Sequence, residues 1–250
     1  MGETCISDVC TSLYMTVAQY QMNPYDVILA SASPRRFDLL TALAVPFRVV
    51  VSDAEEALHL PPALFLARMP NVAVDIHDHP TVRAWRKGET CALLHPDAVV
   101  IAADTIVVLD GVVLNKPRDE ADATAMLTRL SGREHEVYTG MAVFAPQREP
   151  LLYVQCSHVQ MLPLTATLIA SYIASGEPMD KAGAYGIQGL AGRLVTAVTG
   201  SLTNVVGLPL SLLVQALAEV GVTCGRTPPQ AYAAWRHALP VDLLPEASEL

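Results

Sequence analysis

The chain has 250 residues, of which 52% are hydrophobic and 16% charged, and its formal net charge is −9 at pH 7. This length suffices for one large domain or two small ones, and the hydrophobic content excludes intrinsic disorder. The acidic balance excludes a general nucleic-acid binder, which needs a basic surface. Positive charge is scarce, because only three lysines, Lys87, Lys116 and Lys181, accompany the arginines. A binding site for an anion would have to concentrate these few cations locally.

The sequence predicts neither a membrane span nor a secretory leader. The apolar run 98–109 is too short to cross a bilayer and contains Asp104, while the run 205–222 is interrupted by Gly207 and Pro209. The first residues lack a basic segment followed by an apolar one. The five cysteines are odd in number and form no CxxC pair, which indicates free thiols. We therefore expect a cytoplasmic protein without a membrane contact.

The first elements in chain order surround a turn rich in hydroxyl and guanidinium groups. Residues 1–24 show no clear period and are predicted to be an N-terminal extension. The apolar run 27–30 is typical of a buried strand, and 47–51 predicts a second one. Between them, Ser33 is a candidate N-cap and Pro34 suits the first turn of a helix.

The next stretch predicts a helix over about 62–69, ended by Pro70, and then an irregular surface insert over about 70–95. Residues 225–250 contain four prolines and predict a peripheral C-terminal tail. Mixed strands and helices between these limits indicate an α/β or α+β class, with one domain over 25–224. The remaining predicted elements are strands at 97–109, 112–114, 135–144 and 151–162, a hairpin turn at 110–111, and helices at 119–130, 165–175 and 210–220.

Three segments combine residue types that suit phosphate chemistry. Residues 31–36, Ser-Ala-Ser-Pro-Arg-Arg, place hydroxyl and guanidinium groups where a strand enters a helix, an arrangement that binds anions. An ordinary capped helix with solvated arginines is the simpler interpretation. Asp104 interrupts an apolar strand, so it is a candidate general base or Mg²⁺ ligand, or a strand-end carboxylate bonded to backbone. Lys116 follows the hairpin and offers a point charge for a phosphate, although a solvated lysine is the default.

Two glycine-rich segments and one histidine pair are less specific. Residues 180–189 and 200–210 permit close backbone approach to a ligand. Neither matches the P-loop or Rossmann spacing, and tight loops explain both locally. His77-Asp78-His79 resembles a metal-ligand cluster but lacks a third placed ligand, so we expect no metal there.

Six motifs follow one another along the chain: SxSPRR at 31–36, ADT at 103–105, KP at 116–117, LSGxxHxVxTG at 130–140, KAGAYGIQG at 181–189 and NVVGLPL at 204–210. Taken together, they resemble the Maf family of nucleoside triphosphate pyrophosphatases over about residues 27–219. The resemblance implies an elongated mixed α/β sheet with flanking helices, two lobes around a deep groove, and a homodimer. It implies hydrolysis of a nucleoside triphosphate to the monophosphate and diphosphate with a divalent cation, Mg²⁺ or Mn²⁺. KAGAYGIQG resembles the branch that acts on dTTP and UTP.

The resemblance also assigns roles to individual positions. Asp104 would accept the proton of the attacking water and hold the metal together with Glu56. The residues tied to substrate choice would be Arg35, Thr105 and Gln188, and those along the triphosphate path would be Ser31, Ser33, Arg36, Lys116 and Lys181.

One position departs from the family pattern, because Pro70 falls where the resemblance places a helical lysine in an A-R-x-K-A context. Lys87 or Arg68 would then have to supply that charge. If neither does, the chain would be a nucleotide-binding regulatory protein with weak or lost turnover. A third interpretation keeps the chemistry but changes the substrate to a modified or purine nucleotide.

Overall fold

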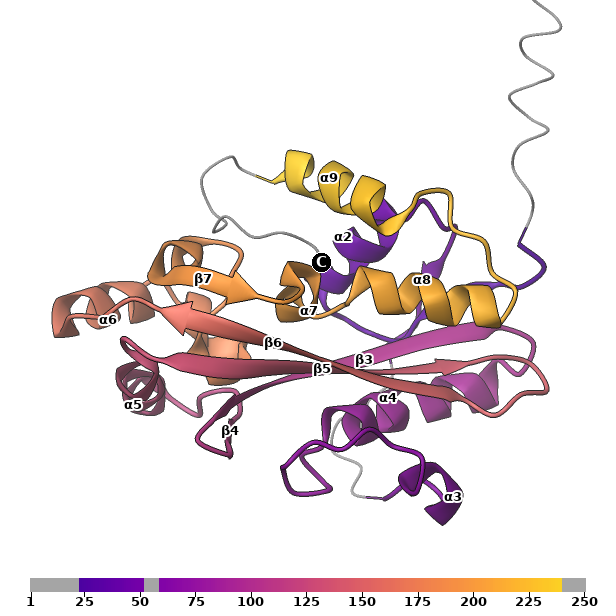
Figure 1. Ribbon diagram of the computed structural model, residues 1–250, viewed down its shortest axis with the longest axis horizontal. Helices are drawn as coiled ribbons and strands as arrows, with labels where there is room; N and C mark the ends of the chain where they lie inside the picture. Colours follow the sequence, from indigo (N-terminus) through magenta and orange to yellow (C-terminus); the bar gives the residue numbers. More distant parts are fainter. Residues whose placement is uncertain (1–22, 52–58, 240–250) are drawn as a thin grey trace, which may run out of the picture.

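The computed structural model of the chain describes residues 23–51 and 59–239, and its centre is a seven-stranded mixed sheet (Figure 1). The strand order is β2-β1-β3-β5-β6-β7, with β4 paired to β3. β1 pairs in parallel with β2 and β3, and every other pairing is antiparallel. The strands are β1 Val27–Leu29, β2 Arg48–Val49, β3 Val99–Leu109, β4 Val112–Leu114, β5 Glu134–Phe144, β6 Leu151–Met161 and β7 Val195–Thr199.

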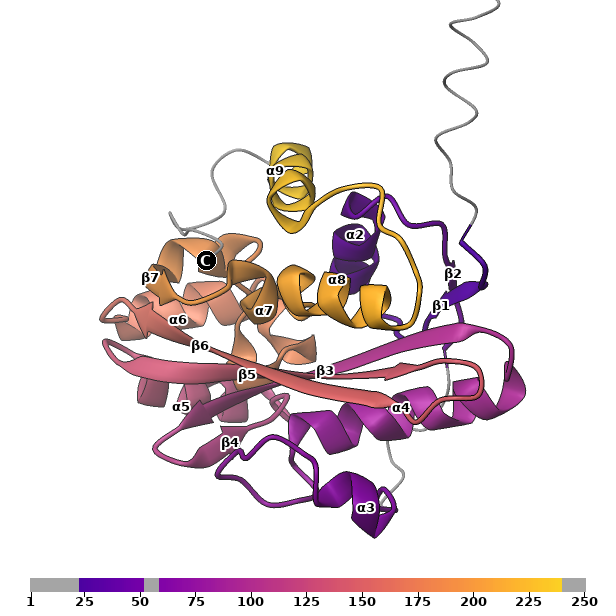
Figure 2. The same ribbon diagram turned by 45° about the vertical axis from the view of Figure 1, so that its right-hand side comes forward.

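Helices cover both faces of this sheet. Helices α2, α7, α8 and α9 lie over one face and α4 lies against the other, as Figures 1 and 2 show. The predicted α/β class with flanking helices is therefore confirmed. The helices are α2 Pro34–Ala42, α3 Ala63–Leu66, α4 Pro80–Leu94, α5 Glu120–Leu130, α6 Ala166–Ile173, α7 Leu202–Val206, α8 Leu210–Glu219 and α9 Pro228–Ala238, with 3₁₀ turns η2 Glu177–Asp180, η3 Ala182–Ala184 and η4 Leu190–Leu194.

The outer edge of β3 is only partly paired. Its first residues, 99–101, pair with β1, and its last, 107–109, pair with β4. On the other edge, β5 pairs continuously with residues 100–108. Residues 102–106 therefore have no strand partner on the outer edge within the part of the chain that the structure describes. Since successive side chains of a strand alternate between its two faces, the side chains of Asp104 and Thr105 lie on opposite faces of the sheet at this gap.

Helix α4 corrects the prediction of an irregular insert over 70–95. Residues 80–94 form a fifteen-residue helix, which begins at the N-cap His79 and has Pro80 in its first turn. Its first turn packs on Gly140 of β5, where a Cβ would lie 2.2 Å from the Thr81 backbone nitrogen. Further along, a Cβ on Gly88 would lie 2.4 Å from the Phe144 ring. The two glycines thus allow α4 to lie close against the sheet.

The C-terminal part of the chain is also more than a peripheral tail. Prolines 228 and 229 begin α9, which buries Ala231 and Trp235 and packs against α2 and α8. The shared core between the sheet and helices α2, α5, α8 and α9 is built mainly of leucine, valine and isoleucine. Among residues 23–51 and 59–239, no helix has both the length and the apolar character needed to cross a membrane.

Candidate active site

A cavity of about 1100 Å³ opens at the gap in the β3 edge. Its walls come from the turn between β1 and α2, the middle of β3, the N-terminal half of α4, the loop after β4, and the segment around η2 and η3. Among the residues that the structure describes, seven cationic side chains face three carboxylates there, a balance of +4 in a chain whose net charge is −9. The cations are Arg35, Arg36, Arg83, Arg86, Lys87, Lys116 and Lys181, and the carboxylates are Asp78, Asp104 and Asp180.

Arg36 is fixed by three hydrogen bonds at the start of α2. Its Nε donates to the Gly207 carbonyl at 2.8 Å, one Nη to Ser31 Oγ at 3.1 Å, and the other to Thr105 Oγ1 at 3.2 Å. The side chain is buried, so the alternative of a solvated arginine is wrong here. Ser33 occupies the N-cap position but makes no side-chain cap, contrary to the prediction, and lines the cavity instead.

A buried chain of polar groups supports Thr105 from behind. The Thr105 hydroxyl bonds to that of Thr139 at 2.9 Å, and Thr139 Oγ1 donates to the Asn204 carbonyl at 2.8 Å. The Asn204 amide group donates to the Val137 carbonyl and to Ser157 Oγ. Because Asn204 and Thr139 are fully buried and hydrogen-bonded, this network fixes the hydroxyl that in turn orients Arg36. The NVVGLPL segment is therefore a support for the cavity rather than only a tight loop.

Asp104 is the buried carboxylate of the cavity. Its Oδ1 accepts a hydrogen bond from Lys87 Nζ at 2.7 Å, and its side chain is 11% exposed. Its Oδ2 is buried without a hydrogen-bond partner, with Arg83 Nη1 at 3.9 Å. Burial of a carboxylate oxygen without a hydrogen-bond donor costs free energy unless a ligand, metal ion or water binds it. An open carboxylate oxygen is a ligand of the type that Mg²⁺ and Mn²⁺ prefer.

Of the two cations considered for the departure at Pro70, Lys87 is the one that lies beside Asp104. It projects from α4 in the context Ala84-Trp85-Arg86-Lys87-Gly88 and reaches the Asp104 carboxylate. Arg68, the other candidate, pairs with Glu149, and both side chains are more than half exposed. The cation beside Asp104 is therefore supplied by Lys87, and all three lysines of the chain line one cavity.

Arg83 is a cavity residue that the sequence prediction missed. One of its Nη atoms donates to Asn115 Oδ1 at 3.0 Å and also to Asp78 Oδ1, which ties α4 to two loops. It precedes Lys87 by four residues, so the two cations share one face of α4. The sequence signal that could have revealed this helix is Pro80 after the possible N-cap His79, followed by Arg83 and Lys87 at helical spacing. His77 also lines the cavity, and its Nδ1 lies 3.0 Å from one Nη of Arg86.

The η2–η3 segment contributes Lys181 and a tyrosine. Lys181 Nζ donates to the Glu177 carbonyl and to Asp180 Oδ1, both at 2.6 Å. Its stem passes over Gly186, where a Cβ would lie 2.6 Å from the lysine Cδ and Cε. Tyr185 lines the cavity and its hydroxyl lies 2.7 Å from His135 Nε2. Burial lowers the pKa of His135 to about 4, so this imidazole is neutral at physiological pH.

One described site residue, Gln188, is not among those that line the cavity, and a second predicted residue is not described. Gln188 follows the lining residues Gly186 and Ile187, and its buried Oε1 has no hydrogen-bond partner. Glu56, the predicted second metal ligand, lies outside the described residues. The structure brings together the other predicted residues, Ser31, Ser33, Arg35, Arg36, Asp104, Thr105, Lys116 and Lys181.

Comparison with known proteins agrees with the sequence motifs. Residues 26–220 match the family model described as "Maf-like protein". A dTTP/UTP pyrophosphatase of Symbiobacterium thermophilum is 44% identical over 197 residues, which cover 78% of this chain and 94% of that protein. The dTTP/UTP pyrophosphatase of Deinococcus radiodurans is 43% identical over 198 residues, covering 79% of this chain and 94% of that protein.

This chain belongs to the Maf family.

The matched range of the Maf-like family contains every residue that lines the cavity. Similarity to solved structures is weaker. The Ham1 protein of Staphylococcus aureus has a TM-score of 0.37 at 13% identity, covering 54% of this chain and 71% of that one. A nucleoside-triphosphatase, dITP/XTP pyrophosphatase, of Mycobacterium abscessus has a TM-score of 0.33 at 17% identity, covering 56% and 76%.

Proposed function

We propose that this Maf-family chain is a nucleoside triphosphate pyrophosphatase that hydrolyses dTTP, UTP or related pyrimidine nucleotides, as house-cleaning of the nucleotide pool. The observation that carries the proposal is the cation-lined cavity around Asp104, whose Oδ2 lacks a hydrogen-bond donor. A triphosphate carries about three to four negative charges, since its last pKa lies near neutrality like that of a phosphomonoester. The local charge of +4 matches that value.

The proposed reaction is attack of water on the α-phosphorus. Asp104 Oδ2 takes a proton from the water as the new oxygen–phosphorus bond forms. The bond from the α-phosphorus to the bridging oxygen breaks, and diphosphate leaves with the electron pair. Such a displacement needs charge neutralisation and positioning more than covalent help from the protein. Lys87 and Arg83 stand beside Asp104 and would neutralise the phosphate oxygens there, while Arg36, Lys116 and Lys181 would hold the rest of the triphosphate.

A divalent cation, Mg²⁺ or Mn²⁺, belongs to this proposal. Asp104 and Glu56 would hold it, and when bound it would supply charge neutralisation at the phosphates and a more acidic water. Lys87 occupies Oδ1, so the metal and the attacking water would both be served from the Oδ2 side of Asp104.

For the base we propose the side of the cavity formed by Tyr185, Gly186 and Ile187, next to Gln188. The Gln188 amide offers one acceptor and two donors on a plane. Uracil and thymine present a carbonyl O4 beside an N3–H, which is the complementary pair. Arg35 and Thr105 are the other proposed specificity positions. Thr105 would act through Arg36, because its hydroxyl accepts from that guanidinium.

Four further expectations remain proposals, of which the homodimer rests on the family resemblance and the others on the cysteines, the charge and the element pattern of the sequence. The chain would act as a homodimer, in the cytoplasm and without a nucleic-acid partner. Its pyrophosphatase domain would extend over 25–224, with an N-terminal extension over 1–24 and a C-terminal segment from 225. Helix α9, which packs against α2, belongs physically to the same unit.

A panel of nucleotides tests this function. Purified protein with Mg²⁺ or Mn²⁺ is offered dTTP, UTP, CTP, the purine triphosphates and modified nucleotides in competition, and diphosphate and monophosphate are measured. We expect dTTP and UTP to release diphosphate faster than the other nucleotides. Preference for a modified or purine nucleotide would change the proposed substrate but not the proposed reaction. Tight dTTP binding by calorimetry without diphosphate from any nucleotide would refute the enzyme and support a regulatory binding protein.

A further inference from the structure

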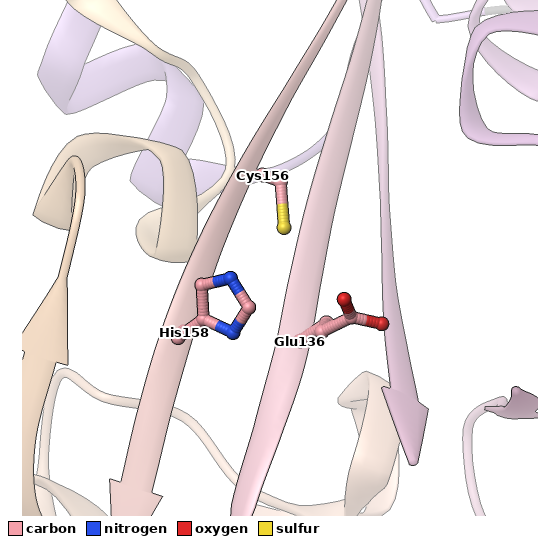
Figure 3. Close-up of side chains that lie close together, drawn as sticks. All are labelled: Glu136, Cys156 and His158. Atoms are coloured by element: carbon pink, nitrogen blue, oxygen red, sulfur yellow. The ribbon is translucent and has the colours of Figure 1, made fainter. Parts of the chain in front are cut away.

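Three potential metal ligands converge on the sheet away from the nucleotide cavity. Glu136 lies on β5 directly opposite His158 of β6, and Cys156 lies two residues before His158 on the same strand face. Their carboxylate, imidazole and thiol ligand atoms all lie within 4.8 Å of one another, and Figure 3 shows the three side chains together. We propose that Glu136, Cys156 and His158 form a binding site for a zinc ion.

This site is distinct from the cavity around Asp104. In the β3–β5 register Asp104 pairs with Gly140, whereas Glu136 pairs with Val108. Four residues along a strand correspond to about 13 Å. None of the three ligands is among the residues that line the cavity. A metal ion held here would therefore not be the one that serves hydrolysis.

The three ligand types favour zinc over the hard cations. Thiolate and imidazole suit Zn²⁺, whereas Mg²⁺ prefers an all-oxygen shell. Tetrahedral zinc with bonds of about 2.0–2.3 Å places its ligand atoms about 3.5 Å apart. The observed limit of 4.8 Å thus requires shifts of about 1 Å, which three partly exposed side chains permit. Cys156 would release its thiol proton to solvent on binding, and a water would complete the shell.

A further carboxylate stands beside the cluster. Glu134 Oε1 lies 3.6 Å from His158 Nδ1, and a carboxylate that closes to hydrogen-bond distance from a metal-bound imidazole orients its ring.

Zinc competition and X-ray absorption test the site. Metal-free protein that carries Cys5→Ser and Cys10→Ser, so that these two thiols cannot contribute, is titrated with ZnCl₂ against a chromophoric chelator of micromolar affinity. Excess Mg²⁺ is present throughout, so that sites made only of oxygen ligands are filled and do not take up zinc. We expect one zinc ion per chain and an absorption spectrum with one sulfur at about 2.3 Å. No zinc uptake, or a zinc shell without sulfur, would overturn the proposal before any of the three proposed ligands is replaced.

Variants then locate the ion. Cys156→Ser and His158→Gln should each weaken zinc binding at least about tenfold, because even outer-shell changes cost that much. The matched control Cys224→Ser removes a half-buried thiol elsewhere and should leave binding unchanged. Equal zinc affinity of Cys156→Ser and the parent protein would contradict the assignment. dTTP hydrolysis by each variant in the absence of zinc reports that the chain is folded, since these residues lie outside the cavity.

Discussion

Replacement of Lys87 by glutamine tests the cation that stands beside Asp104. The pair is short, with 2.7 Å between Lys87 Nζ and Asp104 Oδ1, and the two side chains are only 15% and 11% exposed. Removal of one partner of a buried ion pair costs about 3–5 kcal/mol, because the other charge is left buried. Some water still reaches this pair, so we expect the free energy of unfolding to fall by about 3 kcal/mol.

The catalytic effect of Lys87→Gln follows from the charge on the triphosphate. Loss of one preorganised donor at a site of developing negative charge lowers the rate about 10²–10³-fold. Diphosphate release from dTTP with Mg²⁺ measures this loss, and urea unfolding measures the stability. Arg68→Gln is the matched control, since its exposed pair with Glu149 should contribute under about 1 kcal/mol. Activity of Lys87→Gln within threefold of the parent protein, or an equal loss in Arg68→Gln, would refute the reasoning.

Three more predictions concern groups in and around the cavity. The lowered pKa of His135, about 4 against 6.5, means that protonation favours the unfolded chain. The free energy of unfolding should therefore fall by about 3 kcal/mol from pH 7 to pH 4, and a His135→Leu variant that keeps this slope would contradict it. Gly186→Ala should displace the Lys181 stem and raise KM for dTTP severalfold more than kcat changes; an unchanged KM would count against Lys181. Gly140→Ala should push the first turn of α4 off β5 and lower Tm, and calorimetry would show no change if that packing were unimportant.

Much of the central sheet could be predicted from the sequence because its patterns are local. The apolar run of β3, the Asp-Gly turn and the strands β5 and β6 all follow from the order of apolar and turn residues. Asp104 was recognisable because a carboxylate inside such a run is costly without a partner. Its environment at the gap between β1 and β4 depends on the register of three strands and was not predictable.

Helix α4 shows why other parts could not be predicted. Its cavity-facing side carries Arg83 and Lys87, and its sheet-facing side includes Gly88 instead of a large apolar residue. This composition hides the usual helical period, so the segment resembles a surface insert. The prolines that begin α9 have the same effect, since a proline at a helix start resembles a break. Lys87 could be placed beside Asp104 only once α4 was seen against the sheet.

The central claim is that Asp104 accepts the proton of the water that attacks the triphosphate. The most direct measurement compares Asp104→Asn with the parent protein in single-turnover dTTP hydrolysis, together with dTTP binding by calorimetry. Asparagine keeps the size of the side chain but is a far weaker base. The account predicts bound dTTP and a rate of diphosphate release reduced at least about 10³-fold, the scale of a general base combined with lost charge stabilisation. Diphosphate release by Asp104→Asn at a rate close to that of the parent protein would contradict it.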